Sequence, residues 1–273
     1  MNEINTAANW IQSAAGLLIL SGAGMGVDSG LPDFRGDRGF WKAYPMYERL
    51  GVRFAQAANP IHFDQDPEFG WGFYAHRLAL YRQTEPHRGF YFPQQWAERF
   101  GSSLFAVTSN VDGQFQKAGF SDEQIFEVHG SIHHLQCTRP CSHSIWTNQL
   151  NIPLDLKKMR ARNIPRCPSC DSVSRPNILM FGDPSWLENR TREQEQRFQQ
   201  FLDTSEHENI VAIEIGAGLA VPTIRMMTER LARRGVRSIR INPFDASIAA
   251  PNLSLQLTGL SAFEQLNHLL AAA

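Results

Sequence analysis

The sequence has no long hydrophobic run and no excess of charge of either sign. Lys and Arg together number 26 and Asp and Glu 27, so the chain lacks the basic field that binds nucleic-acid backbones or anionic lipid. No segment approaches the roughly 18 uninterrupted apolar residues of a membrane-spanning helix. Asn2 and Glu3 stand where a secretory signal would carry basic residues. We therefore expect a cytoplasmic protein that binds neither nucleic acid nor a membrane.

Cysteine is also scarce, and its four copies form two short-spaced pairs. Cys137 and Cys141 have three residues between them, Cys167 and Cys170 have two, and 25 residues separate the pairs. Four thiolates in this pattern complete a tetrahedral shell and leave no position open for catalysis. Because disulfides are disfavoured in the cytosol, we predict one structural zinc ion, with redox-active or unliganded cysteines as the alternative. A nucleic-acid-binding finger is a rival interpretation, which the neutral composition disfavours.

Hydrophobic residues make up 42% of the 273 residues, enough for a full core. Two short apolar runs, 16–20 and 209–215, are typical of buried parallel strands, and a glycine-rich turn follows each of them. Two such units predict an α/β fold with a Rossmann-like, doubly wound parallel sheet. Further candidate strands are 104–108, 177–181 and 236–241.

Changes in residue pattern predict two insertions in this sheet domain. Residues 44–100 are rich in aromatics and helix-like, which indicates a helical insert. Residues 135–175 contain all four cysteines and several prolines, which indicates a small zinc module. The Rossmann-like domain then consists of residues 1–43, 101–134 and 176–273.

Gly22 and Gly24 begin a glycine-rich turn directly after the first predicted strand. Backbone N–H groups and a helix N-terminus could cradle a pyrophosphate there, where a Cβ would block the approach. The strict dinucleotide fingerprint fails at Val27, which leaves a plain tight turn as the alternative. The acidic residue expected about 20 positions later is missing, since Lys42 lies there, and an NAD oxidoreductase is therefore disfavoured.

Six ordered blocks of sequence resemble the sirtuin family and together span nearly the whole chain. They are residues 22–24 with 29–35 (Ser-Gly-Leu-Pro-Asp-Phe-Arg), 108–112 (Thr-Ser-Asn-Val-Asp) with 118–119, 127–130 (Glu-Val-His-Gly), the paired cysteines, 175–177 with 181–183, and 216–218 with 221–222 and Asn242. The resemblance implies NAD as co-substrate. The residues that it assigns to NAD are Gly22, Ala23, Gly24, Asp33, Phe34, Arg35, Ser109, Asn110, Val111, Asp112, Gly216, Ala217, Gly218 and Asn242.

The resemblance also assigns roles within this cofactor site. Asp112 and the Val111 backbone are expected to hold the nicotinamide carboxamide, and Asn110 to order the ribose and a water. Phe34 is expected to shield the reactive carbon, and Arg35 to lie near the phosphates.

The implied activity is NAD-dependent removal of an acyl group from protein lysine, with Asn110, Asp112 and His129 as catalytic residues. The acyl-lysine carbonyl oxygen attacks the ribose carbon as nicotinamide leaves. His129, which titrates near neutral pH and stands where the family keeps its base, then activates a ribose hydroxyl. This hydroxyl attacks the resulting imidate, lysine is released, and the acyl group ends on ADP-ribose. Protein ADP-ribosyl transfer or NAD hydrolysis on the same scaffold is the alternative, and a non-catalytic NAD-sensing module is a third class.

Several positions depart from the family pattern on the cofactor side. Gly26 replaces a serine, Ser109 replaces a glutamine that touches the ribose, 114–115 (Gln-Phe) replaces a leucine-histidine pair, and 217–218 (Ala-Gly) replaces a threonine-serine pair. Each change removes about 0.5 to 1.5 kcal/mol of polar contact if nothing compensates. We therefore expect weaker NAD binding or altered chemistry.

Tyr74 and Arg77 lie three residues apart in a predicted helix, 69–83, and so share one face. Periodicity alone would make them a packing aromatic and a solvated arginine. In sirtuins that remove succinyl, malonyl or glutaryl groups, however, a Tyr-x-x-Arg pair at this place binds the acyl carboxylate. Trp71 and Phe73 are then expected to wall the acyl pocket. The residues assigned to substrate are Tyr74, Arg77, Phe181 and Gly182.

Overall fold

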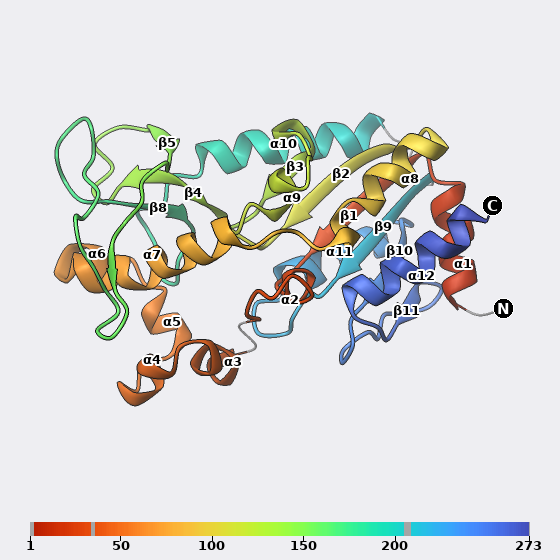
Figure 1. Ribbon diagram of the computed structural model, residues 1–273. Coiled ribbons are helices and arrows are strands. Elements are labelled where there is room, and N and C mark those ends of the chain that lie inside the picture. Colours follow the sequence, from red (N-terminus) through yellow and green to blue (C-terminus); the bar gives the residue numbers. More distant parts are fainter. Residues whose placement is uncertain (1–2, 34–35, 205–208, 273) are drawn as a thin grey trace.

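The computed structural model describes residues 3–33, 36–204 and 209–272, which form an α/β domain with a smaller lobe at one end (Figure 1). The domain contains a six-stranded sheet in the order β11-β10-β9-β1-β2-β3, and all neighbouring strands are parallel. Its strands are β1 (Gly16–Ser21), β2 (Ser103–Thr108), β3 (Ile125–Glu127), β9 (Ile210–Ile215), β10 (Arg237–Ile241) and β11 (Leu253–Leu255). The predicted Rossmann-like parallel sheet is confirmed.

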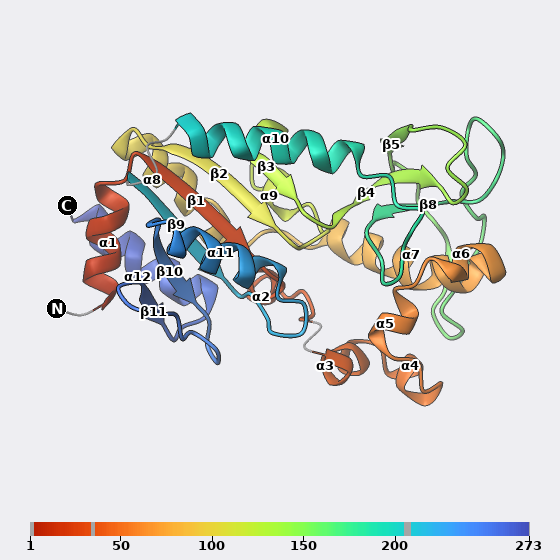
Figure 2. The same cartoon turned by 180° about the vertical axis from the view of Figure 1, so that it is seen from behind.

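Helices cover both faces of this sheet, as the two opposite views show (Figures 1 and 2). Leu17 and Ile19 of β1 pack with one set of helices, and Leu18 and Leu20 pack with the other set. The first set is α1 (Glu3–Gln12), α8 (Phe92–Phe100) and α12 (Gly259–Ala271), and the second is α10 (Asn189–Thr204) and α11 (Thr223–Arg233). A strand buried on both faces has no solvent side, which explains its unbroken apolar sequence. No helix in the described part of the chain is long and apolar enough to cross a membrane.

The chain order reverses at β1, which lies between β2 and β9. In open parallel sheets, ligands bind beyond the carboxyl ends of the strands at such a reversal. The turns 22–24 and 216–218 follow β1 and β9 at that edge, and a short helix, α2 (Gly24–Val27), begins within the first turn. The fold therefore brings both glycine turns to the position where a ligand is expected.

The smaller lobe combines helices with two antiparallel sheets around an aromatic-rich core. Its helices are α3 (Gly36–Ala43), α4 (Pro45–Arg49), α5 (Phe54–Ala57), α6 (Ile61–Gln65) and α7 (Pro67–Gln83), and its strands are β4 (Gly130–Cys137), β5 (Ile145–Thr147), β6 (Leu154–Asp155), β7 (Arg160–Ala161) and β8 (Ser174–Ile178). Short elements complete the fold: η1 (Arg88–Phe90), α9 (Gln114–Lys117) and η2 (Asp122–Gln124). Residues 44–100, all of them described, contain helices and no strand, as expected.

The strand predicted over 177–181 is shifted and belongs to the smaller lobe rather than to the parallel sheet. β8 begins at Ser174 and pairs antiparallel with β4, with Ser174 opposite Cys137. The reason is connectivity, because β4 leads into the first cysteine pair and β8 leaves the second, so the chain returns beside the strand on which it entered. Both strands run across the expected limits of the zinc module at 135 and 175.

Candidate active site

A cavity of about 520 Å³ lies at the carboxyl edge of the sheet, bounded by both glycine turns and by α7 of the smaller lobe. Most residues singled out in the sequence line it. These are Gly22, Ala23, Gly24, Asp33, Tyr74, Arg77, Ser109, Asn110, Val111, Asp112, His129, Phe181, Gly216, Ala217, Gly218 and Asn242. Gly182 is not among the lining residues, and Phe34 and Arg35 lie outside the described residues. The volume is in the range of small-molecule and cofactor sites.

The two glycine turns pack backbone against backbone. Gly22 N–H donates to the Ile215 carbonyl at 3.0 Å, and Gly24 N–H donates to the Gly216 carbonyl at 3.0 Å. A Cβ on Gly22 would lie 2.7 Å from the Ala217 Cα, and one on Gly24 would lie 2.6 Å from the Gly216 Cα. Glycine is therefore required for the turns to meet, and their exposed backbone forms one end of the cavity. This cradle and the room beside it fit a dinucleotide such as NAD.

The segment after β2 is fastened to the first glycine turn. Asn110 Nδ2 donates to the Gly22 carbonyl at 3.0 Å, and Asn110 N–H donates to Thr108 Oγ1 at 3.0 Å. Thr108 in turn bonds Ser21 Oγ at 2.8 Å. Ser109 Oγ lies 3.4 Å from the Ser21 carbonyl, so the serine hydroxyl is directed at the β1 backbone. These contacts place Asn110 between the two strands that flank the cavity.

Asp112 is buried, and the hydrogen bond from the backbone offsets only part of the cost of burying its carboxylate. Its Oδ1 accepts a hydrogen bond from Gln114 N–H at 2.9 Å. Burial raises the pKa of Asp112 to about 6. Its carbonyl lies 2.8 Å from His133 Nε2, which must therefore carry the proton of that bond. The left-handed Gly113 (φ +73°) makes room for the His133 ring, which a Cβ would approach to 2.7 Å.

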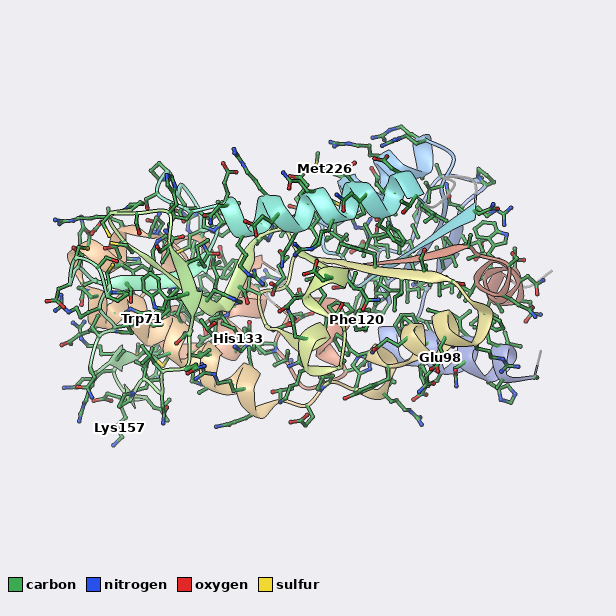
Figure 3. All side chains as sticks on the ribbon, turned by 90° about the horizontal axis from the view of Figure 1, so that it is seen from above. Trp71, Glu98, Phe120, His133, Lys157 and Met226 are labelled. Carbon is green, nitrogen blue, oxygen red and sulfur yellow. The ribbon has the colours of Figure 1, made fainter. Side chains whose placement is uncertain are left out.

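No sequence motif pointed to His133, which lies on β4 and contacts the backbone of Asp112. Figure 3 shows it between the smaller lobe and the sheet. Gln114, one of the departures from the family pattern, donates from Nε2 to the Thr84 carbonyl at 3.2 Å. The loop after Asp112 is therefore held by side chains of β4 and α9.

His129 lies between β3 and β4 with its two ring nitrogens in different environments. Nδ1 lies 3.2 Å from the Ser109 carbonyl, and because a carbonyl only accepts, the proton sits on Nδ1. Nε2 therefore carries the lone pair, and it lies 3.3 Å from Thr223 Oγ1. Burial lowers the pKa of His129, which keeps the ring neutral at physiological pH. This histidine can accept a proton at Nε2.

The second glycine turn is held by two side chains from the C-terminal half. Asn242 Nδ2 and Arg225 Nε both donate to the Ala217 carbonyl at 3.1 Å. Asn242 Oδ1 also accepts from the N–H groups of Phe244 and Asp245, at 3.0 and 3.1 Å. Asn242 was predicted, whereas the buried Arg225 carried no sequence signal.

Tyr74 and Arg77 line the cavity from α7 of the smaller lobe, and both are buried. Arg77 is 7% exposed, so the interpretation as a solvated arginine is wrong. Phe73 stacks beneath its guanidinium, with Cζ 5.1 Å from the ring centroid. Neither Trp71 nor Phe73 is among the residues that line the cavity, contrary to the expectation. Trp71 Nε1 instead donates to the Ser174 carbonyl at 2.8 Å in the smaller lobe (Figure 3). Phe181 packs edge-on against Phe54 with ring centroids 5.7 Å apart.

The four cysteine sulfurs form one cluster, in which all Sγ atoms lie within 4.8 Å of one another. The Sγ atoms of Cys137 and Cys170 are 3.6 Å apart, and those of Cys141 and Cys167 are 3.7 Å apart. A zinc tetrahedron with Zn–S bonds of about 2.3 Å has sulfur–sulfur distances of about 3.8 Å. The cluster thus fits a structural zinc ion, and none of its members lines the cavity.

Residues 22–222 match the model of the Sir2 family, and these residues include both glycine turns, His129 and all four cysteines. The chain belongs to the Sir2 family. An NAD-dependent protein deacylase of Thermococcus sibiricus is 30% identical over 181 residues, 66% of each chain. An NAD-dependent protein deacetylase of Saccharolobus solfataricus is 27% identical over 230 residues, 84% of this chain and 81% of that protein.

The fold agrees with this assignment over nearly the whole chain. The crystal structure of a Sir2 homologue in complex with NAD superposes with a TM-score of 0.75 at 25% identity, covering 98% of this chain and 94% of that one. The alignment with the Thermococcus protein spans about two thirds of its length. The family model therefore covers β2, β9, the glycine turns and the cysteine cluster.

Proposed function

We propose that this Sir2-family protein removes acyl groups from protein lysines in an NAD-dependent reaction that yields nicotinamide and O-acyl-ADP-ribose. The observation that carries the proposal is the acceptor nitrogen of His129, located in the same cavity as both glycine turns, Asn110 and Asp112. Two relatives named as NAD-dependent protein deacylase and deacetylase support it. Protein ADP-ribosyl transfer and NAD hydrolysis are the alternatives, and they need no acyl-lysine.

The residues that line the cavity have distinct tasks in this scheme. Bound NAD supplies an electrophilic ribose carbon with nicotinamide as leaving group. The Asp112 carboxylate accepts hydrogen bonds from a carboxamide, and Asn110 orders polar groups beside the first glycine turn. His129 takes a proton at Nε2 and holds it while the Ser109 carbonyl keeps the ring in place. The apolar wall near Phe181 keeps water from the reacting face.

Replacing the base tests this scheme directly. We expect His129→Ala to reduce deacylation at least 100-fold, the usual cost of losing a general base, while folding and zinc content stay unchanged. The measurement is the rate of nicotinamide release with an acetyl-lysine peptide. His268→Ala, which removes an exposed histidine of α12, is the matched control and should keep the wild-type rate. Near-normal turnover of His129→Ala would remove this residue from the mechanism.

We also propose a preference for acidic acyl groups over acetyl. Support comes from Arg77, a buried cation at the cavity wall beside Tyr74, where a bound carboxylate would form a charge-assisted contact. Such hydrogen bonds contribute about 1.5 to 3 kcal/mol, so kcat/KM for succinyl-lysine should exceed that for acetyl-lysine by roughly tenfold to a hundredfold. Arg77→Met should reverse the order. Equal loss of both activities would mean that Arg77 only supports the fold.

We further propose that the chain works in the cytoplasm and keeps the division into a sheet domain, a helical insert at 44–100 and a zinc module at 135–175. No disulfide joins any of the four cysteines, all of which are described, and this suits a reducing compartment. Acylated protein lysines are the proposed partners.

A further inference from the structure

Tyr81, a residue outside every sequence motif, makes the closest contacts with the Arg77 guanidinium. It lies one helical turn after Arg77 on α7, so the two side chains share a face. Arg77 Nε and Nη2 both donate to the Tyr81 hydroxyl oxygen, at 2.9 and 2.6 Å. Cζ of Arg77 is 5.3 Å from the Tyr81 ring centroid. Tyr81 is 6% exposed and lines the cavity together with Tyr74 and Arg77.

The two hydrogen bonds determine what the Tyr81 hydroxyl can offer a ligand. A phenol oxygen has two acceptor lone pairs and a single proton. Both lone pairs are directed to Arg77, so the hydroxyl can only donate to any further partner. A neighbouring cation strengthens such a donor. Burial also raises the pKa of Tyr81, which keeps the hydroxyl protonated at neutral pH.

The same bonds determine which edge of Arg77 a carboxylate can use. Tyr81 holds the edge formed by Nε and Nη2. A carboxylate that binds Arg77 in a bidentate manner cannot use this edge while Tyr81 occupies it. Aromatic rings of Phe73 and Tyr74, with centroids 5.1 and 5.8 Å from Cζ, restrain the guanidinium from turning.

We propose that Tyr81 is a specificity-determining residue, whose hydroxyl donates a hydrogen bond to the terminal carboxylate of a dicarboxylic acyl group while its oxygen fixes the orientation of Arg77. The inference rests on the proposed acidic-acyl preference and adds to it a third polar residue, four positions beyond the Tyr-x-x-Arg pair. An acetyl group has no terminal carboxylate and gains nothing from this hydroxyl. Tyr81 therefore acts on the choice of acyl group and leaves the chemistry at the ribose unchanged.

The test is Tyr81→Phe, which removes the hydroxyl and keeps the ring. Succinyl-lysine and acetyl-lysine peptides of equal sequence compete in one reaction with NAD, and mass spectrometry follows both deacylated products. The ratio of the two kcat/KM values does not depend on the amount of folded enzyme. We expect this ratio to fall by roughly tenfold to a hundredfold, with the loss in KM for the succinyl peptide.

Tyr47→Phe is the matched control. The Tyr47 hydroxyl is also buried within the aromatic core of the smaller lobe, and it has no hydrogen-bond partner among the described residues. Its removal should change the ratio less than twofold. A similar loss in both variants would mean that the core as a whole sets the acyl preference, and it would overturn the role of Tyr81.

The outcomes also separate this inference from the proposals on which it rests. If Arg77→Met reverses the preference but Tyr81→Phe retains it, Tyr81 is only a structural partner, and the acidic-acyl proposal stands. If the wild-type protein prefers acetyl, both the acidic-acyl proposal and the role of Tyr81 are overturned, whereas deacylation itself stands. If neither peptide is deacylated, the proposed activity is wrong.

Discussion

At the scale of single residues, burial moves the two central ionisable groups in opposite directions. It raises the pKa of Asp112 to about 6 and lowers the pKa of His129 below its ordinary value of 6.5. At neutral pH, His129 is therefore uncharged and can accept a proton. Asp112 is ionised there, but its charge is held in a buried site at a cost to folding stability.

That cost predicts that Asp112→Asn stabilises the fold as the pH rises. The folded pKa of about 6 exceeds the ordinary value of 3.8, so the folded state binds the proton more tightly than the unfolded chain. The resulting stabilisation is complete below about pH 4 and is lost as the pH rises through 6. Asparagine does not titrate, so the stability advantage of the variant should grow by about 1 kcal/mol between pH 5 and pH 8. Denaturant unfolding at both pH values measures this change.

The control for this prediction is Asp203→Asn, which changes an exposed carboxylate on α10 and should leave the pH dependence of unfolding as in wild type. Asp112→Asn should also lose deacylase activity, because the carboxylate is assigned to the carboxamide. An advantage that shrinks between pH 5 and pH 8 would contradict the raised pKa of Asp112.

Individual site residues were predictable where a motif contained them and not otherwise. The segments 108–112 and 127–130 pointed to Asn110, Asp112 and His129, which do line one cavity. His133 and Arg225 were missed because each bonds a backbone carbonyl, 21 and 8 residues away respectively, that belongs to another element or turn. Only the fold brings such partners together, so no local pattern could indicate them.

At the scale of elements, a short apolar run followed by glycine predicted a parallel strand correctly, because two physical requirements coincide at such a position. β1 and β9 are buried on both faces, and the turns after them approach too closely for any Cβ. The run at 177–181 lacked this support. Its strand, β8, pairs with β4. A fully buried ion pair between Arg175 Nη1 and Asp183 Oδ2, 2.7 Å apart, joins β8 to the loop after it. Pairing between distant strands left no signal in a single run.

The zinc module gives the prediction that belongs to this scale. We expect one zinc ion per chain, bound by Cys137, Cys141, Cys167 and Cys170, whose sulfurs are clustered. Metal binding should supply most of the free energy of folding of the module that carries these cysteines. Chelation should remove hydrogen-exchange protection from residues 135–175 and leave β1 protected. Metal analysis of protein purified without chelator, followed by exchange measured with mass spectrometry, tests both statements. Protein that contains no zinc, or a module that stays protected without it, would refute them.

At the scale of the whole molecule, the site exists only where the sheet domain and the smaller lobe meet. The glycine turns and Asn242 belong to the domain, whereas Tyr74, Arg77 and Tyr81 come from α7 of the lobe. The parallel sheet and the order of the blocks could be predicted from sequence. The burial of Tyr74, Arg77 and Tyr81 could not be predicted from sequence, since it depends on how the aromatic core of the lobe packs around α7.

One measurement tests the proposed activity most directly. The protein is incubated with NAD and an acetyl- or succinyl-lysine peptide, or with an unmodified peptide, and the products are weighed by mass spectrometry. The account predicts deacylated peptide, nicotinamide and O-acyl-ADP-ribose in equal amounts, and no NAD consumption with the unmodified peptide. Free ADP-ribose formed at the same rate without an acyl group, or a mass increase of the protein by ADP-ribose, would contradict it.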